Sequence, residues 1–307
     1  MRRPFGYRLS AIGSALLAPA LASVPAGRAT AQTKPDFEVH RELAPGRRFY
    51  LANIIGDVQI TGGTGRMLEV TAIKKAHREG DPRDVVIELV ELDDGIAVCV
   101  RYPGTRHRSS SATPKAEHPC SSQEGRWGWD GNDRNDTEVN FTVRVPPGLR
   151  LEIGTVSGDV AAESLDGEIE LHSVSGDVGL HGGRGSRIGL KTVSGDLELL
   201  EVVSKDVSAQ TVSGEITFRG PVQDSGTYDF ATTSGDIALA LPGRPNATLK
   251  AATFSGDFAS DLPVNQDEPR RHRHRFDATW GSGSAKLYLE SLSGDVTIRV
   301  GSTSKRS

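Results

Sequence analysis

The sequence predicts an all-β protein, a parallel β-solenoid with coils of about 19 residues and an N-terminal capping β-sheet. Three observations predict this fold. The string Ser-Gly-Asp, with Glu in one copy, recurs seven times between residues 155 and 296. Apolar residues flank each copy at period-2 spacing, which is the strand pattern. The composition, with 35 Gly and only 2 Met in 307 residues, favours strands and turns over helices.

The N-terminal residues 1–31 have the pattern of a secretory signal peptide. A basic start precedes an apolar stretch from Leu9 to Val24, and Ala29-Thr30-Ala31 fits a small-x-small cleavage site before Gln32. The Arg2-Arg3 pair suits either general or twin-arginine export. The apolar stretch is broken and shorter than the ~20 residues that a membrane span needs. We therefore expect an exported protein, periplasmic or at the cell surface, with no transmembrane segment after signal removal.

The charge balance excludes some partner classes. Removing residues 1–31 takes away four arginines and no acid, so the balance of basic against acidic residues changes from 36:40 to 32:40, a net charge of about −8. Nucleic acid and anionic lipid both reward clustered Lys and Arg. We expect neither as a general partner.

The repeat unit has apolar residues at offsets 0, 2, 5, 9 and 11, as in Ile188, Leu190, Val193, Leu197 and Leu199. Successive starts from residue 151 differ by 18, 19, 19, 21, 21 and 38, and the last step is twice 19. One coil is therefore expected to have lost its SGD within residues 261–283, an inserted loop followed by a degenerate strand. The units start at Leu151, Ile169, Ile188, Val207, Tyr228, Leu249 and Leu287, with an outlying copy at Phe49.

Each unit reads as strand, turn, strand, because offsets 0 and 2, then 9 and 11, are period-2 steps. All five apolar positions are expected to face the core, with Val193 and Leu197 pointing inward on either side of one corner. A unit this short cannot bury its apolar face alone, so units stack and share one core. The solenoid is predicted to span residues 151–300, with residues 301–307 as a C-terminal tail.

The SGD residues are predicted to be structural corners. Gly tolerates the φ > 0 that a sharp corner needs, and Asp and Ser side chains can bond nearby backbone groups. One acid per turn leaves too few oxygens for calcium. Catalysis needs one differentiated cluster instead of a ladder of equivalent residues, and His172 and His181 read as surface residues. We expect no catalytic residue, no cofactor and no metal.

The N-terminal region, residues 47–150, follows a linker at 32–46 and is predicted to cap the first coil. Four segments read as strands, and Asp93-Asp94-Gly95 is the turn of a hairpin. A long loop, residues 103–137, interrupts them, and a loop of this length is functional or disordered. The strand segments are 67–76, 85–92, 95–102 and 138–145.

The two cysteines are predicted to form a disulfide. Cys99 alternates with Val98 and Val100, so if these two face the core, Cys99 faces outward, where Cys120 of the loop can reach it. Two cysteines in an exported protein usually pair. The alternative is a metal site that adds His107 and His118, although their spacing matches no standard zinc pattern.

Two exposed segments are candidate interaction surfaces. Trp127 and Trp129 in the 103–137 loop either anchor the loop on the solenoid end or present a stacking surface to sugar rings. Arg271 and Arg273, in the basic run of the 261–283 insertion, either contact anionic groups or lie in a solvated loop.

Two strings carry a resemblance to a known family: "VNFTVRVPPGLRLEIGTVSGDV" (139–160) and "FYLANIIGDVQITGG" (49–63). Together with the SGD units they resemble the "putative-adhesin" or "toastrack" β-repeat domains of bacterial envelope proteins, over residues 47–300. The resemblance implies a non-enzymatic role in adhesion, envelope scaffolding or envelope stress sensing. The expected partner is an envelope protein or a glycan, and end-to-end self-association is a further expectation. The alternative function is a carbohydrate-binding or carbohydrate-active β-helix protein that uses the 103–137 loop.

Overall fold

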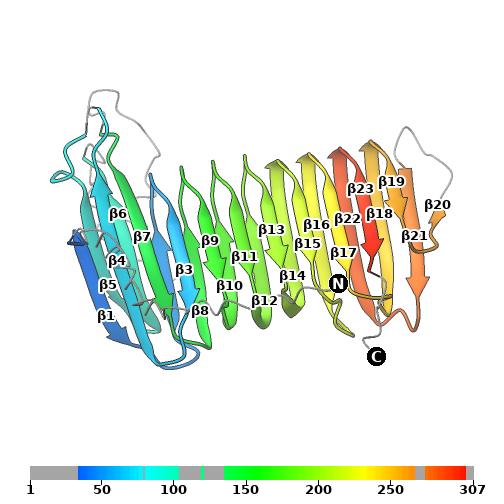
Figure 1. The fold of residues 1–307 in the computed structure, drawn as a ribbon, viewed down its shortest axis with the longest axis horizontal. Helices are drawn as coiled ribbons and strands as arrows, with labels where there is room; N and C mark the ends of the chain where they lie inside the picture. Colours follow the sequence, from blue (N-terminus) through cyan, green and yellow to red (C-terminus); the bar gives the residue numbers. More distant parts are fainter. Residues whose placement is uncertain (1–33, 79, 104–118, 121–134, 267–273, 302–307) are drawn as a thin grey trace, which may run out of the picture. The chain divides into compact units, whose positions relative to one another are not determined.

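Two long sheets contain all the strands of the residues that the computed structural model describes, which are 34–301 except 79, 104–118, 121–134 and 267–273 (Figure 1). The signal-peptide prediction lies outside this range. The described residues form strands and turns and no helix. In chain order the strands are β1 (Phe37–Glu42), β2 (Arg48–Ala52), β3 (Val58–Gly62), β4 (Met67–Lys75), β5 (Val86–Leu92), β6 (Gly95–Arg101), β7 (Glu138–Val145), β8 (Leu149–Gly154), β9 (Val160–Glu163), β10 (Gly167–His172), β11 (Val178–His181), β12 (Arg184–Lys191), β13 (Leu197–Leu200), β14 (Val203–Ser213), β15 (Ile216–Arg219), β16 (Thr227–Ser234), β17 (Ile237–Leu241), β18 (Ala247–Ser255), β19 (Phe258–Ser260), β20 (Asn265–Gln266), β21 (His274–Trp280), β22 (Ala285–Ser293) and β23 (Val296–Val300).

Each repeat places its first strand in a 12-stranded sheet and its second strand in an 11-stranded sheet. Neighbouring coils pair in parallel and in register, so that Ile169 of β10 lies opposite Leu151 of β8 and Ile188 of β12. The second strands do the same, with Val178 of β11 between Val160 and Leu197. This arrangement confirms the predicted all-β parallel solenoid.

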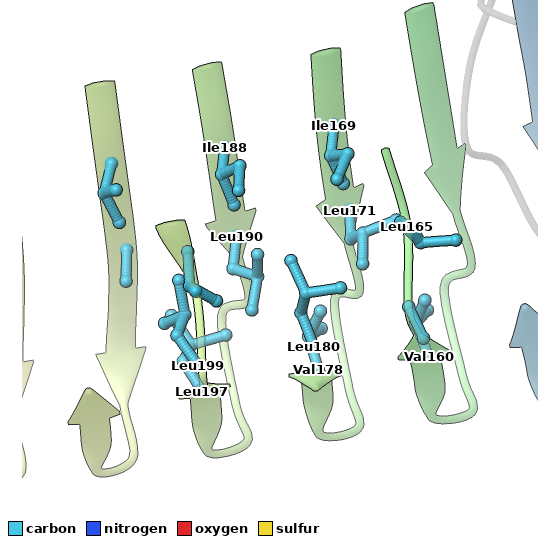
Figure 2. Packing of buried hydrophobic residues seen from close by; sticks show 14 of the residues in the cluster. Val160, Leu165, Ile169, Leu171, Val178, Leu180, Ile188, Leu190, Leu197 and Leu199 are labelled. Carbon is cyan, nitrogen blue, oxygen red and sulfur yellow. The ribbon is translucent and has the colours of Figure 1, made fainter. Parts of the chain in front are cut away.

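The core lies between the two sheets. Figure 2 shows Ile169 and Leu171 of one sheet directed toward the layer that contains Val178 and Leu180 of the other, and all four side chains are at most 1% exposed. Complete burial of one such side chain contributes about 1.5–3 kcal/mol relative to leaving it in water. Offsets 0, 2, 9 and 11 of the repeat are therefore core positions, as predicted.

The prediction that offset 5 faces the core is wrong. Val193 is 46% exposed, whereas Leu197 on the other side of the same corner is 1% exposed. The inward position is offset 4, where Thr192 is 5% exposed. The reason is that strand alternation continues one step further, through offsets 0, 2 and 4, before the chain turns.

The order of coils in space differs from their order in sequence. The last coil, β22 and β23, lies between the coil of β16 and β17 and the coil of β18 and β19. Leu287 of β22 pairs with both Tyr228 and Leu249. The segment expected to form a degenerate coil does not lie between these two coils. Its strand β21 pairs antiparallel with β18 and, together with the two-residue β20, forms the outer edge of the 12-stranded sheet.

The N-terminal strands continue both sheets. The outlying copy forms a complete coil, because β2 and β3 pair with β8 and β9. Beyond it, β7, β4 and β1 extend the 11-stranded sheet, while β6 and β5 extend the other. The β5–β6 hairpin confirms the predicted turn, with Leu92 opposite Gly95. Part of the segment expected to be a linker forms β1.

The terminal strands β1 and β20, one at each end of the stack, carry features that oppose edge-to-edge pairing. β1 bears Glu38, His40, Arg41 and Glu42, and β20 at the other end has only two residues. Charged side chains and short strands both make a sheet edge a poor template for another chain. The described residues contain no helix that is long and apolar enough to cross a membrane.

Candidate functional site

The SGD turns lie along one edge where the chain passes from the 12-stranded to the 11-stranded sheet. We call this the corner edge, and each coil contributes five residues to it. Its segments, in stack order, are 53–57, 155–159, 173–177, 192–196, 211–215, 232–236, 291–295 and 253–257.

The corner glycines cannot carry a side chain. Gly195 has φ of 155°, and a Cβ atom added to it would lie 2.1 Å from the carbonyl oxygen of Gly176 in the neighbouring coil. Gly214 stands in the same relation to Gly195, at 1.9 Å. At the glycine, each corner therefore lies directly against the backbone of the next. The predicted positive φ is confirmed at six SGD glycines: Gly158, Gly176, Gly195, Gly214, Gly235 and Gly294.

The buried hydroxyl at offset 4 links neighbouring corners. Thr211 Oγ1 donates to the carbonyl of Gly195 at 3.2 Å, and Thr192 Oγ1 donates to that of Gly176 at 3.0 Å. The same bond occurs in every coil from residue 155 onward, made by Thr155, Ser173, Thr192, Thr211, Thr232, Ser291 and Thr253. This role was missed in the sequence, although a Thr or Ser at offset 4 of all seven units was its signal.

A Thr211→Val substitution tests this hydroxyl. Valine keeps the shape but leaves the Gly195 carbonyl without its donor, so we expect the free energy of unfolding to fall by about 1 kcal/mol. Urea denaturation measures it. The matched control is the adjacent Val212→Thr, which changes an exposed position and should stay within about 0.5 kcal/mol of wild type. Equal effects from the two variants would contradict the assigned hydrogen bond.

The acidic residues form a second row of bonds along the corner edge. Asp159 Oδ1 accepts the backbone N–H of Asp177 at 2.9 Å, and Asp177 Oδ1 accepts that of Asp196 at 2.8 Å. In the first coil, Asn140 Oδ1 accepts the backbone N–H of Asp57 at 2.9 Å. Further bonds of this kind join Asp57 to Asp159, Asp196 to Glu215, Asp236 to Asp295 and Asp295 to Asp257.

Glu215 interrupts this row among the described residues. Its carboxylate accepts the hydroxyl of Thr217 at 3.2 Å instead. The Ser of each SGD contributes its backbone, as where Ser175 N–H donates to Val156 C=O and Ser175 C=O accepts from Gly158. The Gly, the Asp and the buried Thr or Ser are thus all engaged in holding coils together. The described residues contain no group of three or more His, Cys, Asp or Glu side chains placed to hold a metal ion.

The side chain at one position of most corners points away from the core. The exposed residue at offset 5 is apolar in most coils, with Val174 44%, Val212 49% and Leu292 51% exposed. In stack order this row, which we call the apolar row, consists of Ile54, Val156, Val174, Val193, Val212, Thr233, Leu292 and Phe254.

The first predicted surface histidine is half-buried. The imidazole of His172 covers Gly154 of the preceding coil, where an added Cβ would lie 2.0 Å from Nε2. Burial lowers the pKa of His172, against the raising effect of Glu152 and Glu170, and Lys191 adds to the lowering. His181 is exposed and pairs with Glu201 at 3.5 Å. Neither histidine lies in a catalytic cluster.

The lowered pKa of His172 makes stability depend on pH. The folded state keeps the imidazole neutral to a lower pH than the unfolded chain, whose pKa is near 6.5, so stability falls as pH drops below this value. A His172→Gln variant should lose part of that fall, measured as the difference in unfolding free energy between pH 7.5 and pH 5. His181→Gln is the exposed control. An unchanged pH dependence in His172→Gln would contradict the effect of burial.

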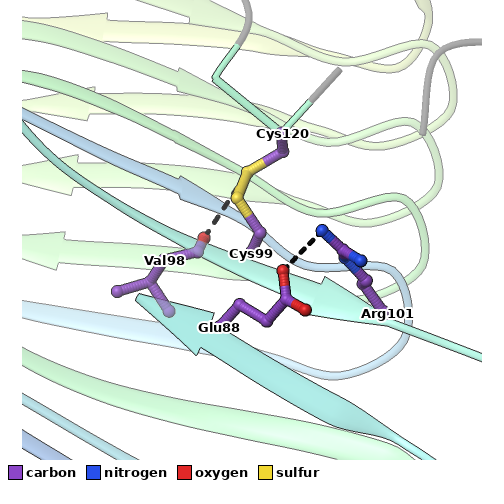
Figure 3. The surroundings of a disulfide bond; sticks show 5 residues. All are labelled: Glu88, Val98, Cys99, Arg101 and Cys120. Atoms are coloured by element: carbon purple, nitrogen blue, oxygen red, sulfur yellow. Dashed lines mark hydrogen bonds and ion pairs between the residues drawn. A yellow bond between two sulfur atoms is a disulfide. The ribbon is translucent and has the colours of Figure 1, made fainter. Parts of the chain in front are cut away.

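The predicted disulfide is present. Cys99 and Cys120 are joined with Cα atoms 5.6 Å apart (Figure 3). Val98 and Val100 belong to the main core, whereas Cys99 packs on the outer side of the sheet in a small buried cluster with Tyr50, Ala97 and Cys120. Because both thiols are consumed, the alternative metal site loses its two sulfur ligands. His107 and His118 lie outside the described residues.

The other candidate surface residues, Trp127, Trp129, Arg271 and Arg273, also lie outside the described residues. The residues on either side of these segments are described.

On the Trp127 side, Tyr102 donates its hydroxyl to the carbonyl of Thr137 at 2.5 Å and lies 3.5 Å from that of Ile55, a corner residue. On the Arg271 side, His274 is opposite Thr253 of the last corner. The described residues Tyr102 and His274, which precede or follow these two segments in the chain, therefore lie beside the corner edge, near its two ends.

The opposite edge carries a groove of about 1000 Å³. Arg184, Arg219 and Arg299 line it together with Asp166 and Glu201. Arg299 is paired with Asp261 at 3.0 Å. Because both signs of charge line this groove, it selects no ligand of one charge.

The fold and the corner edge define a β-solenoid repeat protein whose repeated residues serve its architecture. Residues 147–299 match the family described as Toastrack DUF4097, and this part of the chain belongs to that family. None of the curated proteins is significantly similar to the chain.

Three solved structures are similar at low level. A "putative cell adhesion protein" from Clostridium sporogenes is 12% identical, covering 87% of this chain and 100% of its own, with a TM-score of 0.32. A "putative adhesin" from Bacteroides fragilis is 13% identical, covering 85% and 96%, with a TM-score of 0.41. A "putative lipid binding protein" from Parabacteroides distasonis is 13% identical, covering 85% and 97%, with a TM-score of 0.42.

Proposed function

We propose that this protein is an exported, non-enzymatic envelope protein that acts as an adhesin-like interaction or scaffold module. The observation that carries the proposal is the use of the SGD motif. Its Gly, its acid and the preceding Thr or Ser form equivalent bonds from coil to coil, as in Thr211 to Gly195 and Asp177 to Asp196. Catalysis instead requires one group whose surroundings differ from those of its neighbours. A role in envelope stress would depend on the binding of a partner.

Export is supported by two features. The N-terminal pattern fits a signal peptide, and the Cys99–Cys120 disulfide suits an oxidising compartment. At each end of the stack one terminal strand, β1 or β20, is charged or short, so we propose that partners contact the long sides of the stack in preference to its ends.

Expression of the full chain in a Gram-negative host tests export. We expect the protein in the osmotic-shock fraction, with an intact mass that lacks residues 1–31 and contains no free thiol. A cytosolic protein of full mass with two free thiols would overturn this part of the proposal.

The non-enzymatic role is tested with polysaccharides. The exported protein is incubated with a panel of bacterial polysaccharides, and reducing ends and unsaturated products are measured over time. We expect neither to accumulate. On a glycan array, binding that disappears in a Trp127→Ala/Trp129→Ala variant would favour the carbohydrate-binding alternative, and turnover of any substrate would overturn the non-enzymatic role.

A further inference from the structure

We propose that the apolar row of the corner edge, together with the row of carboxylates beside it, binds a basic amphipathic segment of a partner protein. This inference rests on the proposed interaction function and names the chemistry of the partner. It uses only described residues of the repeated coils.

Folding does not account for the apolar row. Val174, Val193 and Val212 are 44%, 46% and 49% exposed, so their side chains contribute little to the core. The corner does not need an apolar residue there, because Thr233 occupies the same position in one coil and its corner makes the same Thr232 to Gly214 bond. Exposed apolar residues that line up over many coils are typical of an interaction surface.

The inserted coil adds an apolar residue to the row after Thr233. It places Leu292 between Thr233 and Phe254, since β22 lies between β16 and β18. From Val156 to Phe254 the row crosses seven coils, and six spacings of ~4.8 Å give about 29 Å. This length suits an extended contact with another macromolecule better than a contact with a small molecule.

The charges beside the apolar row favour a partner segment with positive charge. Eight acidic residues follow the corner edge, one in each coil: Asp57, Asp159, Asp177, Asp196, Glu215, Asp236, Asp295 and Asp257. The eight corner segments contain no Lys, Arg or His. The apolar row lies three residues before the acidic row within the same five-residue turn, so the two rows run beside each other along the corner edge. Such an edge attracts cationic groups and repels acidic proteins and anionic bilayers.

A helix fits the repeat of this edge. The coil spacing of ~4.8 Å is close to the helix pitch of ~5.4 Å, so a helix that lies along the edge has about one turn beside each coil. Apolar side chains at i, i+3, i+4 and i+7 would cover the apolar row, with Lys or Arg beside them over the carboxylates. A row of about 29 Å accommodates about 19 helical residues at ~1.5 Å each.

The test uses a synthetic 19-residue Leu/Lys amphipathic helical peptide as the probe, with the exported protein in solution. Isothermal titration calorimetry at 50 mM and 300 mM salt measures its affinity. We expect binding that weakens with salt, and at least tenfold weaker binding by a Val174→Thr/Val193→Thr/Val212→Thr variant. Thermal unfolding of this variant should match wild type, because Thr already occupies the equivalent position at residue 233.

A charge variant distinguishes the contribution of the acidic row to binding from that of the apolar row. Asp159→Asn/Asp177→Asn/Asp196→Asn removes three charges but keeps the accepting oxygen, as Asn140 shows by bonding Asp57 N–H. We expect a tenfold or greater loss of affinity at 50 mM salt and a smaller dependence on salt. Glu163→Gln/Asp166→Asn at the opposite edge is the matched control and should bind like wild type.

Three results would overturn the proposal: absence of peptide binding, equal binding of the peptide by the valine variant, or equal binding of a Leu/Glu peptide or of phosphatidylglycerol vesicles. These results leave export and the lack of polysaccharide turnover unaffected. If the protein proved to be cytosolic or catalytic but still bound the peptide, the proposed function would be contradicted and the peptide-binding proposal would stand.

Discussion

A Gly195→Ala variant should lose at least about 3 kcal/mol of unfolding free energy. The new methyl group meets the carbonyl oxygen of Gly176 at 2.1 Å, and the φ of 155° is a conformation that Ala rarely adopts. Neither problem can be relieved by a side-chain rotation, since the opposing atoms are backbone. The neighbouring coils are held by their own bonds, so they cannot move apart without loss of the Thr192 and Thr211 contacts.

Urea denaturation followed by circular dichroism measures this loss. Gly179→Ala is the control, because an added Cβ at Gly179 in β11 has no atom within 4 Å and this residue has no positive φ. We expect the control to remain within about 0.5 kcal/mol of wild type. A Gly195→Ala variant as stable as the control would contradict the stacked-corner arrangement.

The strands and corners could be predicted because they depend on local periodicity. Alternation identified Ile188, Leu190, Leu197 and Leu199 as core residues, and all four are at most 1% exposed. The same rule, applied without interruption, would have placed Thr192 inside and Val193 outside. Hydrophobicity alone favours Val193 over Thr192 as the core residue, and so it does not reveal the exposed apolar row.

The order of the coils could not be predicted from the repeat. Every coil presents the same motif to its neighbours, so the bonds at a corner are equivalent whichever coils meet. The connections decide the order instead. Residues 242–246 let the chain pass over one coil position, and Gly281 and Gly283, with φ of 60° and 67°, reverse it so that β22 can enter the vacant position.

The disulfide could be predicted from alternation, whereas its surroundings could not. Alternation places Cys99 on the outer face of β6, opposite to the core residues Val98 and Val100. That Tyr50 of β2 shields the outer face beside it depends on the pairing of β2 with β6, two strands that are distant in sequence. Contacts between distant strands carry no signal in a single sequence.

Loss of the Cys99–Cys120 bond should lower the free energy of unfolding by about 3 kcal/mol, because the bond closes a loop of 21 residues and restricts the unfolded chain. A Cys99→Ala/Cys120→Ala variant and the reduced wild-type protein should show this loss to within about 0.5 kcal/mol of each other, since both lack only the crosslink. Guanidinium denaturation of the three forms measures it.

The slope of the denaturation curve identifies the state on which the disulfide acts. If the crosslink keeps the unfolded chain compact, its removal exposes more surface on unfolding, and the m-value rises in both forms that lack it. If the bond mainly holds Cys120 against Tyr50 and Ala97 in the folded state, the m-value stays constant and the buried outer cluster loses its packing. We expect the first result, because the main core lies on the other face of β6 and includes neither cysteine. A stability loss without a change in slope would assign the effect to the folded state instead.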